Sequence, residues 1–357
     1  MGPFAAEHYS RIVSLRDILG VRHPVVLGPF GGLSSIELTA AVSSAGGLGS
    51  YGLYGYDAAR IADVITRIRQ QTDRPFAVNL WLPTGDEVTP DAVDIAPLRD
   101  ALAPIYAEVG VAPPGSPARF VPPVDEQLAA VLEARPAVLS LVYGVPEQGL
   151  VAAAHARDIA LVGTATTVAE ARALDAAGVD AIVATGFEAG GHRVSFLGPA
   201  ESALIGTFAL VPQVVDAVAV PVIAAGGIAD RRGVAAAFAL GASGVQVGTA
   251  FLRTRQSAAS AGHRAAIAAA RDDSTRLTRA MSGRLARGIP NRAMALLDAE
   301  DVLPFPAQNW LTGTFRTPAA EQGRSDLVSQ WAGQSAALAR WEDAGEVFAE
   351  LVAGLPR

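Results

Sequence analysis

The chain of 357 residues is 50% hydrophobic and carries a net charge of −7, a composition that excludes an intrinsically disordered protein and provides for one large hydrophobic core. All 28 basic residues are arginines and none form a basic run, so we expect no nucleic-acid partner, because phosphate neutralisation supplies most of that affinity. The absence of cysteine excludes disulfides, thiolate metal sites and cysteine nucleophiles.

Residues 1–20 are polar and charged and lack the apolar core of a secretory leader. Elsewhere no apolar run approaches the length of about 18 residues that a membrane-spanning helix needs. We therefore expect a cytoplasmic protein with no membrane partner.

Short apolar runs without polar alternation, typical of strands buried on both faces, recur as far as residue 247 and alternate with helical patterns. The expected strands are residues 25–27, 48–51, 76–82, 137–142, 159–162, 180–184, 222–225 and 244–247. The expected helices are residues 35–45, 57–71, 168–177, 208–218 and 232–240. This alternation predicts an α/β fold, a closed (β/α)8 TIM barrel.

Two segments exceed a minimal barrel. Residues 84–125, with a Pro- and Gly-rich stretch, predict an insertion after the third strand that contains one helix and an ordered loop. Residues 257–357 are too long for one last barrel helix, and they predict a small helical subdomain over one mouth of the barrel. The expected domains are a barrel at 1–256 and this subdomain, with helical patterns at 258–271, 326–340 and 344–351.

Glycine or a small polar residue follows nearly every expected strand, at the mouth where barrel enzymes place their sites. These small residues leave room for a large, flat ligand. From the first five strands, the candidate residues are Gly28, Pro29, Phe30, Gly31, Asn79, Trp81, Tyr143, Gly163 and Thr164.

The last two strand ends predict a phosphate site. Consecutive backbone amides followed by a helix start form an anion cup. The glycine-containing segment after either strand, taken alone, is equally well explained as a tight turn. Because the chain has no lysine, these amides and a threonine hydroxyl must hold the phosphate. No G-x-G-x-x-G follows the first strand, which argues against a dinucleotide site. The cup residues are Ala225, Gly226, Gly227, Gln246, Gly248 and Thr249.

The sixth expected strand ends in a glycine-rich turn, GFEAGGH, that carries one histidine. Gly190 and Gly191 allow the backbone to lie against a flat ligand, and His192 is the candidate catalytic base. Glu188, four residues earlier, is a candidate to orient the imidazole or to contact the ligand, although a structural turn explains the same pattern. The other histidines (His8, His23, His155 and His263) lack a partner at ligand spacing, and no metal is implied.

In these motifs the chain resembles the nitronate monooxygenases, formerly called 2-nitropropane dioxygenases. The resemblance spans nearly the whole chain and rests on PVVLGPFGG (24–32), GFEAGGH (186–192), IAAGGIAD (223–230), VQVGTAFLRT (245–254), SGRLARGIPNR (282–292), QNWLTG (308–313) and QWAGQS (330–335).

This resemblance implies an FMN-dependent oxidoreductase that oxidises a nitronate or nitroalkane with O2. Its FMN phosphate would bind at Gly227, Gly248 and Thr249, with the flavin ring near residues 29–31. Asn79 and Gln246 would serve as polar contacts to the flavin. His192 matches the histidine that acts as base or substrate orienter.

The chain departs from the family pattern around the expected substrate pocket. Phe30 stands where methionine is usual, Arg193 and Val194 follow the histidine where a glycine is usual, and Tyr143 ends the fourth strand. An aromatic lining of Phe30, Trp81 and Tyr143 beside His192 predicts a larger or flatter substrate than a small nitroalkane.

Two other functions stay open, because a fold and a cofactor do not determine the reaction. Relatives with the same turn include NAD(P)H-dependent flavin reductases of the enoyl-ACP reductase or quinone reductase type. A flavin-binding protein without catalysis is the third reading. The alanine-rich helices are compatible with a homodimer.

Overall fold

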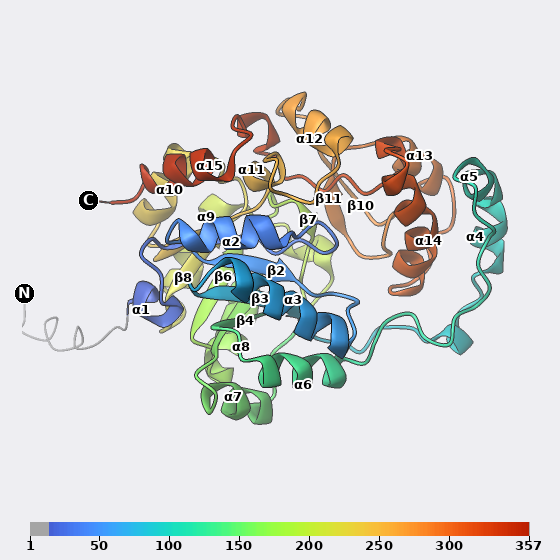
Figure 1. Ribbon diagram of the computed structural model, residues 1–357. Helices are drawn as coiled ribbons and strands as arrows, with labels where there is room; N and C mark the ends of the chain where they lie inside the picture. The colour runs from blue at the N-terminus through green and yellow to red at the C-terminus, as the bar shows by residue number, and fades with distance from the viewer. Residues whose placement is uncertain (1–13, 357) are drawn as a thin grey trace, which may run out of the picture.

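The computed structural model describes residues 14–356, and its centre is one sheet of eight parallel strands in the order β1-β9-β8-β6-β5-β4-β3-β2 (Figure 1). The predicted TIM-barrel fold is therefore confirmed. The strands are β1 (Val25–Leu27), β2 (Gly49–Gly52), β3 (Phe76–Trp81), β4 (Val138–Val142), β5 (Ala160–Ala165), β6 (Ala181–Thr185), β8 (Val222–Ala225) and β9 (Gly244–Val247).

Backbone hydrogen bonds between the two ends of the sheet close the barrel. Leu27 N–H donates to the carbonyl oxygen of Leu48 at 2.9 Å, and Leu48 N–H donates to that of Val25 at 3.0 Å. Val26 and Leu48 form an isolated parallel bridge. Closure leaves no unpaired sheet edge, and it brings the carboxyl ends of all strands to one mouth.

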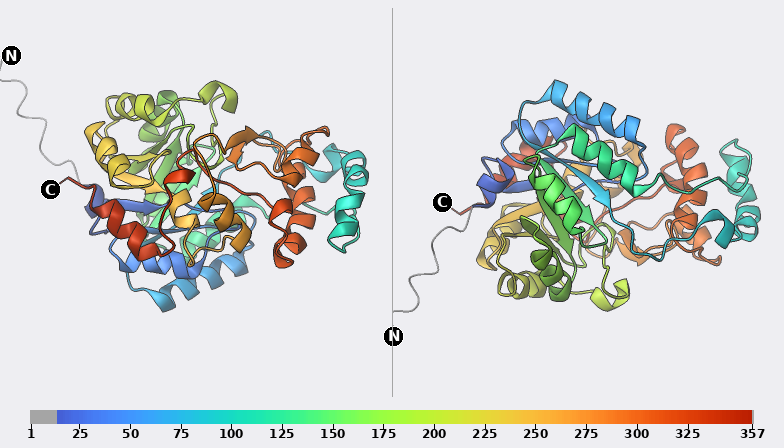
Figure 2. Two further views of the ribbon diagram at one scale, coloured as in Figure 1. Left: turned by 90° about the horizontal axis from the view of Figure 1, so that it is seen from above. Right: turned by 90° about the horizontal axis from the view of Figure 1, so that it is seen from below.

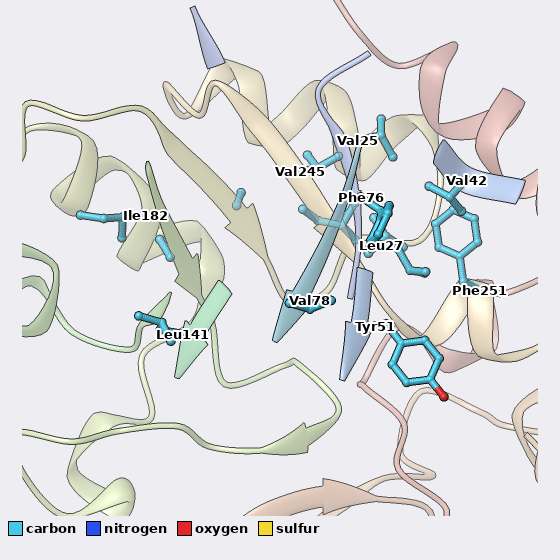
Figure 3. Close-up of a cluster of buried hydrophobic side chains, with 14 of the residues drawn as sticks. Val25, Leu27, Val42, Tyr51, Phe76, Val78, Leu141, Ile182, Val245 and Phe251 are labelled. Carbon is cyan, nitrogen blue, oxygen red and sulfur yellow. The ribbon is translucent and has the colours of Figure 1, made fainter. Parts of the chain in front are cut away.

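The barrel strands are buried on both faces, as their apolar runs predict. In β1, Val25 and Leu27 point outward into the layer beneath the helices, whereas Val26 points into the barrel interior. Figure 3 shows the outer layer, to which several strands contribute. A short helix, α1 (Leu15–Leu19), adds Leu15 and Leu19 to the interior cluster.

Helices between the strands bury one apolar stripe each. In α3, Ile61, Val64 and Ile65 recur at helical spacing and are buried, while Asp57 caps the first turn by accepting from Arg60 N–H at 2.8 Å. The helices of this layer are α2 (Ile36–Ser44), α3 (Ala58–Gln71), α6 (Val124–Ala134), α7 (Gln148–His155), α8 (Val168–Ala177), α9 (Thr207–Val215) and α10 (Arg231–Ala239).

The eighth helix of the barrel comes from the C-terminal end of the chain. Helix α15 (Ala344–Val352) packs against α2, α10 and β1, and Arg231 pairs with Glu350 at 2.5 Å. The chain thus leaves the barrel after β9 and returns to it at α15. The prediction of a helix at 344–351 is confirmed. That residues 257–357 form a domain separate from residues 1–256 stays a prediction.

The insertion after β3 differs from its prediction. It forms two short helices instead of one, α4 (Ala96–Ala101) and α5 (Ala103–Glu108), after a 3-10 turn at Pro90–Ala92. Both helices lie beside α13 (Arg292–Leu297) and α14 (Ala307–Glu321), to one side of the barrel (Figures 1 and 2). Their contacts form a second hydrophobic core, in which Tyr106 donates to the carbonyl oxygen of Leu311 at 3.0 Å.

The expected helix at 326–340 is wrong. Only 3-10 turns at Ser325–Leu327 and Ala336–Leu338 form there, and an extended segment lies between them. The expected helix at 258–271 is confirmed in its central part as α12 (Ala261–Ala268). The sequence patterns missed α14 and the hairpin of β10 (Arg276–Thr278) and β11 (Ala286–Gly288). In the part of the chain that the structure describes, no helix is long and apolar enough to cross a membrane.

Gly49 provides a test of how tightly α2 packs on β2. A Cβ added at Gly49 would overlap the carbonyl oxygen of Thr39 and lie 2.7 Å from Ser43 Oγ. We expect Gly49→Ala to lower the free energy of unfolding by about 3 kcal/mol, the cost of overpacking against rigid backbone. Chemical denaturation measures this loss. Gly149→Ala in α7 is the control, since its Cβ meets nothing within 4 Å; an equal loss in both variants would contradict the packing argument.

Candidate functional site

A cavity of about 370 Å³ opens at the carboxyl ends of the barrel strands, within the size range of small-ligand sites. The structure brings nearly all of the predicted site residues into its wall. These are Gly28, Pro29, Phe30, Gly31, Asn79, Trp81, Thr164, Glu188, Gly190, Gly191, His192, Ala225, Gly226, Gly227, Gln246, Gly248 and Thr249.

Two predicted site residues lie outside the cavity wall. Gly163 faces helix α8, where an added Cβ would lie 2.6 Å from Leu174 Cδ2, so this glycine serves helix packing. Tyr143 is buried behind Trp81, with 4.8 Å between the ring centroids. The guanidinium of Arg284 covers the Tyr143 ring at 4.3 Å. The direct contacts predicted for Gly163 and Tyr143 are therefore corrected.

Unpaired backbone amides gather where β8 and β9 end. The N–H groups of Gly226, Gly227, Gly248 and Thr249 donate to no acceptor within residues 14–356. Gly226 and Gly227 have φ of 97° and 75°, a left-handed conformation that glycine adopts without strain. All four residues line the cavity, and Thr249 begins the short helix α11 (Thr249–Leu252). This is the donor set of an anion cup.

The segment at 329–335, here called the strap, crosses the loop that leads to His192. Gly333 N–H donates to Thr249 Oγ1 at 2.9 Å, and Gln334 N–H donates to the carbonyl oxygen of Glu188 at 2.9 Å. A Cβ at Gly190 would lie 2.6 Å from Gly333 N. Gly190 is thus required for the close approach of the strap.

Glu188 caps the start of α9 and does not contact His192. Its carboxylate accepts from Thr207 N–H at 2.9 Å and from Thr207 Oγ1 at 2.9 Å. The prediction that Glu188 orients the imidazole is therefore wrong.

Strand pairing positions His192. Gly191–His192 form the short strand β7, which pairs antiparallel with β11 so that His192 lies opposite Ala286. His192 Nε2 lies 2.8 Å from Ser282 Oγ. The imidazole meets the rings of Trp81 and Trp331 edge to face, at centroid distances of 5.0 and 5.4 Å. The expected turn is thus a loop followed by a paired strand, which limits the movement of the ring.

Burial, together with the positive charges of Arg284 and Arg316, lowers the pKa of His192 to about 3. The imidazole is consequently neutral at physiological pH. It can offer the cavity either a lone pair or an N–H, depending on which nitrogen carries the proton.

Arg316, on α14, is a cavity residue that sequence reasoning missed. Its NH1 donates to Ser329 Oγ at 2.9 Å and its NH2 to Asn309 Oδ1 at 2.8 Å, while its buried Nε has no partner in the described residues. Burial lowers the pKa of Arg316 to about 10, so it stays charged. No carboxylate in the described segment forms an ion pair with it.

Other cavity residues from the C-terminal part of the chain were also missed as site residues, although two of the resemblance motifs, QNWLTG and QWAGQS, contain most of them. Tyr54 joins them from the loop after β2, with its ring 4.3 Å from that of Trp81. The set comprises Tyr54, Asn309, Trp331, Gly333 and Ser335.

Arg193 does not belong to the substrate face. Its buried guanidinium turns away from the cavity and donates from Nε to the carbonyl oxygen of Ala203 at 3.0 Å and from NH2 to that of Thr166 at 3.1 Å. Val194, in contrast, lines the cavity.

Two further histidines have structural contacts. His263 contacts the carbonyl oxygen of Trp331 at 3.1 Å behind the strap. His155 Nε2 lies 3.0 Å from Asp180 Oδ2 at the surface, which agrees with a structural or surface role. His8 lies outside the described residues. Within the described chain, no group of three or more histidines and carboxylates could hold a metal ion.

Comparisons with known proteins match this chain over nearly its whole length. The sequence model of a family described as "Nitronate monooxygenase" matches residues 13–354. A nitronate monooxygenase of Pseudomonas aeruginosa PAO1 is 42% identical over 341 residues, covering 94% of this chain and 97% of the relative. A probable nitronate monooxygenase of Staphylococcus aureus strain Newman is 38% identical over 346 residues, covering 95% and 96%.

Solved structures give the same picture. A nitroalkane oxidase from Streptomyces ansochromogenes has a TM-score of 0.84 and 36% identity, covering 95% of this chain and 96% of its own. FabK from Thermotoga maritima has a TM-score of 0.73 and 29% identity, covering 94% of both chains.

Proposed function

This chain is an oxidoreductase of the nitronate monooxygenase family, and we propose that it uses FMN to oxidise a nitronate or nitroalkane with O2. One observation carries the proposal. A single cavity combines an amide cup, a neutral histidine and a buried arginine without a carboxylate partner.

The residues present fit FMN. One phosphate suits the free N–H groups of the cup, those of Gly226, Gly227, Gly248 and Thr249. The Thr249 hydroxyl accepts a hydrogen bond from the strap and therefore keeps its own hydrogen for the ligand. The glycines that follow β1 leave a flat wall, to which Asn79 and Gln246 add amide groups. No G-x-G-x-x-G follows β1 to hold the second half of FAD. Bound FMN would supply the transfer of electrons to O2.

Arg316 supports an anionic substrate or intermediate. Burying a guanidinium without a counter-charge is costly unless a ligand supplies the charge. A nitronate is such an anion, and its two oxygens match the spaced N–H donors of a guanidinium. We propose that Arg316 holds the nitronate while His192 contacts the reacting part of the substrate.

The surrounding side chains support a substrate with a flat or bulky apolar part. Phe30, Trp81 and Trp331 line the cavity beside His192, and Tyr54 packs on Trp81. Aromatic faces favour such a group and exclude water from the reaction. The role of His192, as base or as orienting group, is part of this proposal.

The cofactor assignment is tested by mass spectrometry of the molecule released on heating. We expect FMN, in a one-to-one ratio with the chain. Gly248→Asp should empty the site, because its carboxylate would repel the phosphate in a partly desolvated cup at a cost of several kcal/mol, while the barrel stays folded. Gly149→Asp on the exposed face of α7 is the matched control and should retain the cofactor. Release of FAD would contradict the proposal.

The reaction is tested by oxygen consumption of the purified protein with nitronates and nitroalkanes. We expect turnover under air, and no rapid bleaching of the flavin by NADH or NADPH without air. Rapid anaerobic bleaching would instead favour the NAD(P)H-dependent reductase. Neither response would favour a flavin-binding protein without catalysis.

His192→Asn separates the two roles of the imidazole. If His192 is the base, turnover of a neutral nitroalkane should fall by roughly 10² to 10⁴, because asparagine cannot accept the proton. Turnover of the pre-ionised nitronate should fall much less. Since the pKa of His192 is near 3, neither wild-type rate should show a titration of this residue between pH 5 and pH 8. Equal losses on both substrates would mean that His192 only orients the substrate, provided that the FMN content is unchanged.

A further inference from the structure

Ser282 is the hydrogen-bond partner that the described residues provide for the imidazole of His192. It is buried, with 1% of its surface exposed, and it lies 90 residues away along the chain, just before β11. Its Oγ is 2.8 Å from His192 Nε2 and 3.2 Å from the carbonyl oxygen of Arg284. Its Oγ also accepts from Arg284 N–H at 3.4 Å, so the hydroxyl meets one ring nitrogen, one carbonyl and one backbone N–H.

The hydrogen count of this pair favours one tautomer. A serine hydroxyl has a single hydrogen, and the carbonyl oxygen of Arg284 can only accept. If the hydroxyl donates to that carbonyl, Nε2 must carry a proton and donate to Oγ, and both contacts are hydrogen bonds. If the hydroxyl donates to Nε2 instead, the contact with the carbonyl is lost. The first arrangement therefore makes one more hydrogen bond in a buried place, where an unpaired polar group is costly.

The other ring nitrogen is left for the cavity. His192 Nδ1 forms no hydrogen bond to a described residue, yet it is not among the fully buried atoms without a partner, and His192 lines the cavity. With the proton on Nε2, Nδ1 presents a lone pair to the cavity.

We propose that Ser282 is a positioning residue that holds the neutral imidazole of His192 with its proton on Nε2, so that Nδ1 is the proton acceptor. The catalytic part of this proposal rests on the proposed function. In that step the α C–H bond of a neutral nitroalkane breaks and its proton passes to Nδ1. The electron pair of the bond remains on the substrate and delocalises into the nitro group, which gives the nitronate.

The arrangement at Ser282 does not change in this step. Nε2–H donates to Oγ before and after the transfer, and the hydroxyl donates to the carbonyl oxygen of Arg284 throughout. The charged groups that face the ring, Arg284 and Arg316, oppose the imidazolium. Arg316 meanwhile pairs with the nitronate charge that forms.

The first test needs no substrate. Nitrogen NMR of the flavin-loaded protein with ¹⁵N-labelled histidine reports which ring nitrogen carries the proton, and His192→Asn assigns the signals. We expect Nε2–H in the wild type and a mixture of tautomers in Ser282→Ala. A proton on Nδ1 in the wild type, or the same tautomer in both proteins, would overturn the proposal even if the enzyme proves to have another substrate.

The second test compares two substrates. Ser282→Ala should lower kcat for a neutral nitroalkane about 10- to 100-fold, less than complete removal of the base, and should leave kcat for the pre-ionised nitronate within about threefold. Ser195→Ala is the control, because Ser195 is a buried hydroxyl three residues from His192 that bonds Thr166 Oγ1 at 2.7 Å and not the imidazole. Equal losses on both substrates, or the same loss in Ser195→Ala, would contradict a positioning role. Absence of turnover in the wild type would count against the proposed function and not against the tautomer.

Discussion

The close contact between two backbone segments, at Gly190 and Gly333, holds the site together. Neither glycine has room for a Cβ, because the strap and the loop before His192 touch along their main chains. Three features depend on this contact: the orientation of the Thr249 hydroxyl at the amide cup, the placement of Trp331 beside the imidazole, and the enclosure of the cavity. A side chain at either position would push the C-terminal part of the chain off the barrel mouth.

Electrostatics divide the arginines near the cavity into two kinds. Arg284 is balanced by Asp86 and Glu87 from the insertion, at 2.9 and 2.7 Å, and its guanidinium stacks on Phe305. It joins the insertion to the hairpin that carries Ser282. Arg316 has only neutral partners among residues 14–356, so its charge has no counter-ion there. A neutral imidazole near the two adds no third positive charge, which suits the proposed binding of an anion and the release of its product.

Local patterns in the sequence predicted the barrel well and its C-terminal part poorly. The valine-rich run of β1 and the helix α8, which Gly178 caps at its C-terminal end, have the predicted bounds, because their burial and capping are encoded within a few residues. Helix α14 was missed because β-branched residues and Pro318 interrupt its pattern, and 326–340 was overpredicted from its alanines. Likewise, the GGH motif identified His192, whereas Ser282 and Arg316 reach it only through contacts between distant segments, which no local spacing records.

The late return of the chain at α15 has a consequence for biosynthesis. The side of the barrel between α2 and α10 stays uncovered on the nascent protein until α15 leaves the ribosome, because the apolar side chains Val347, Phe348 and Leu351 that pack there follow all of the barrel strands in the sequence. A ribosome-bound barrel would therefore expose an apolar flank during the translation of α11 to α14, when chaperones have access to it.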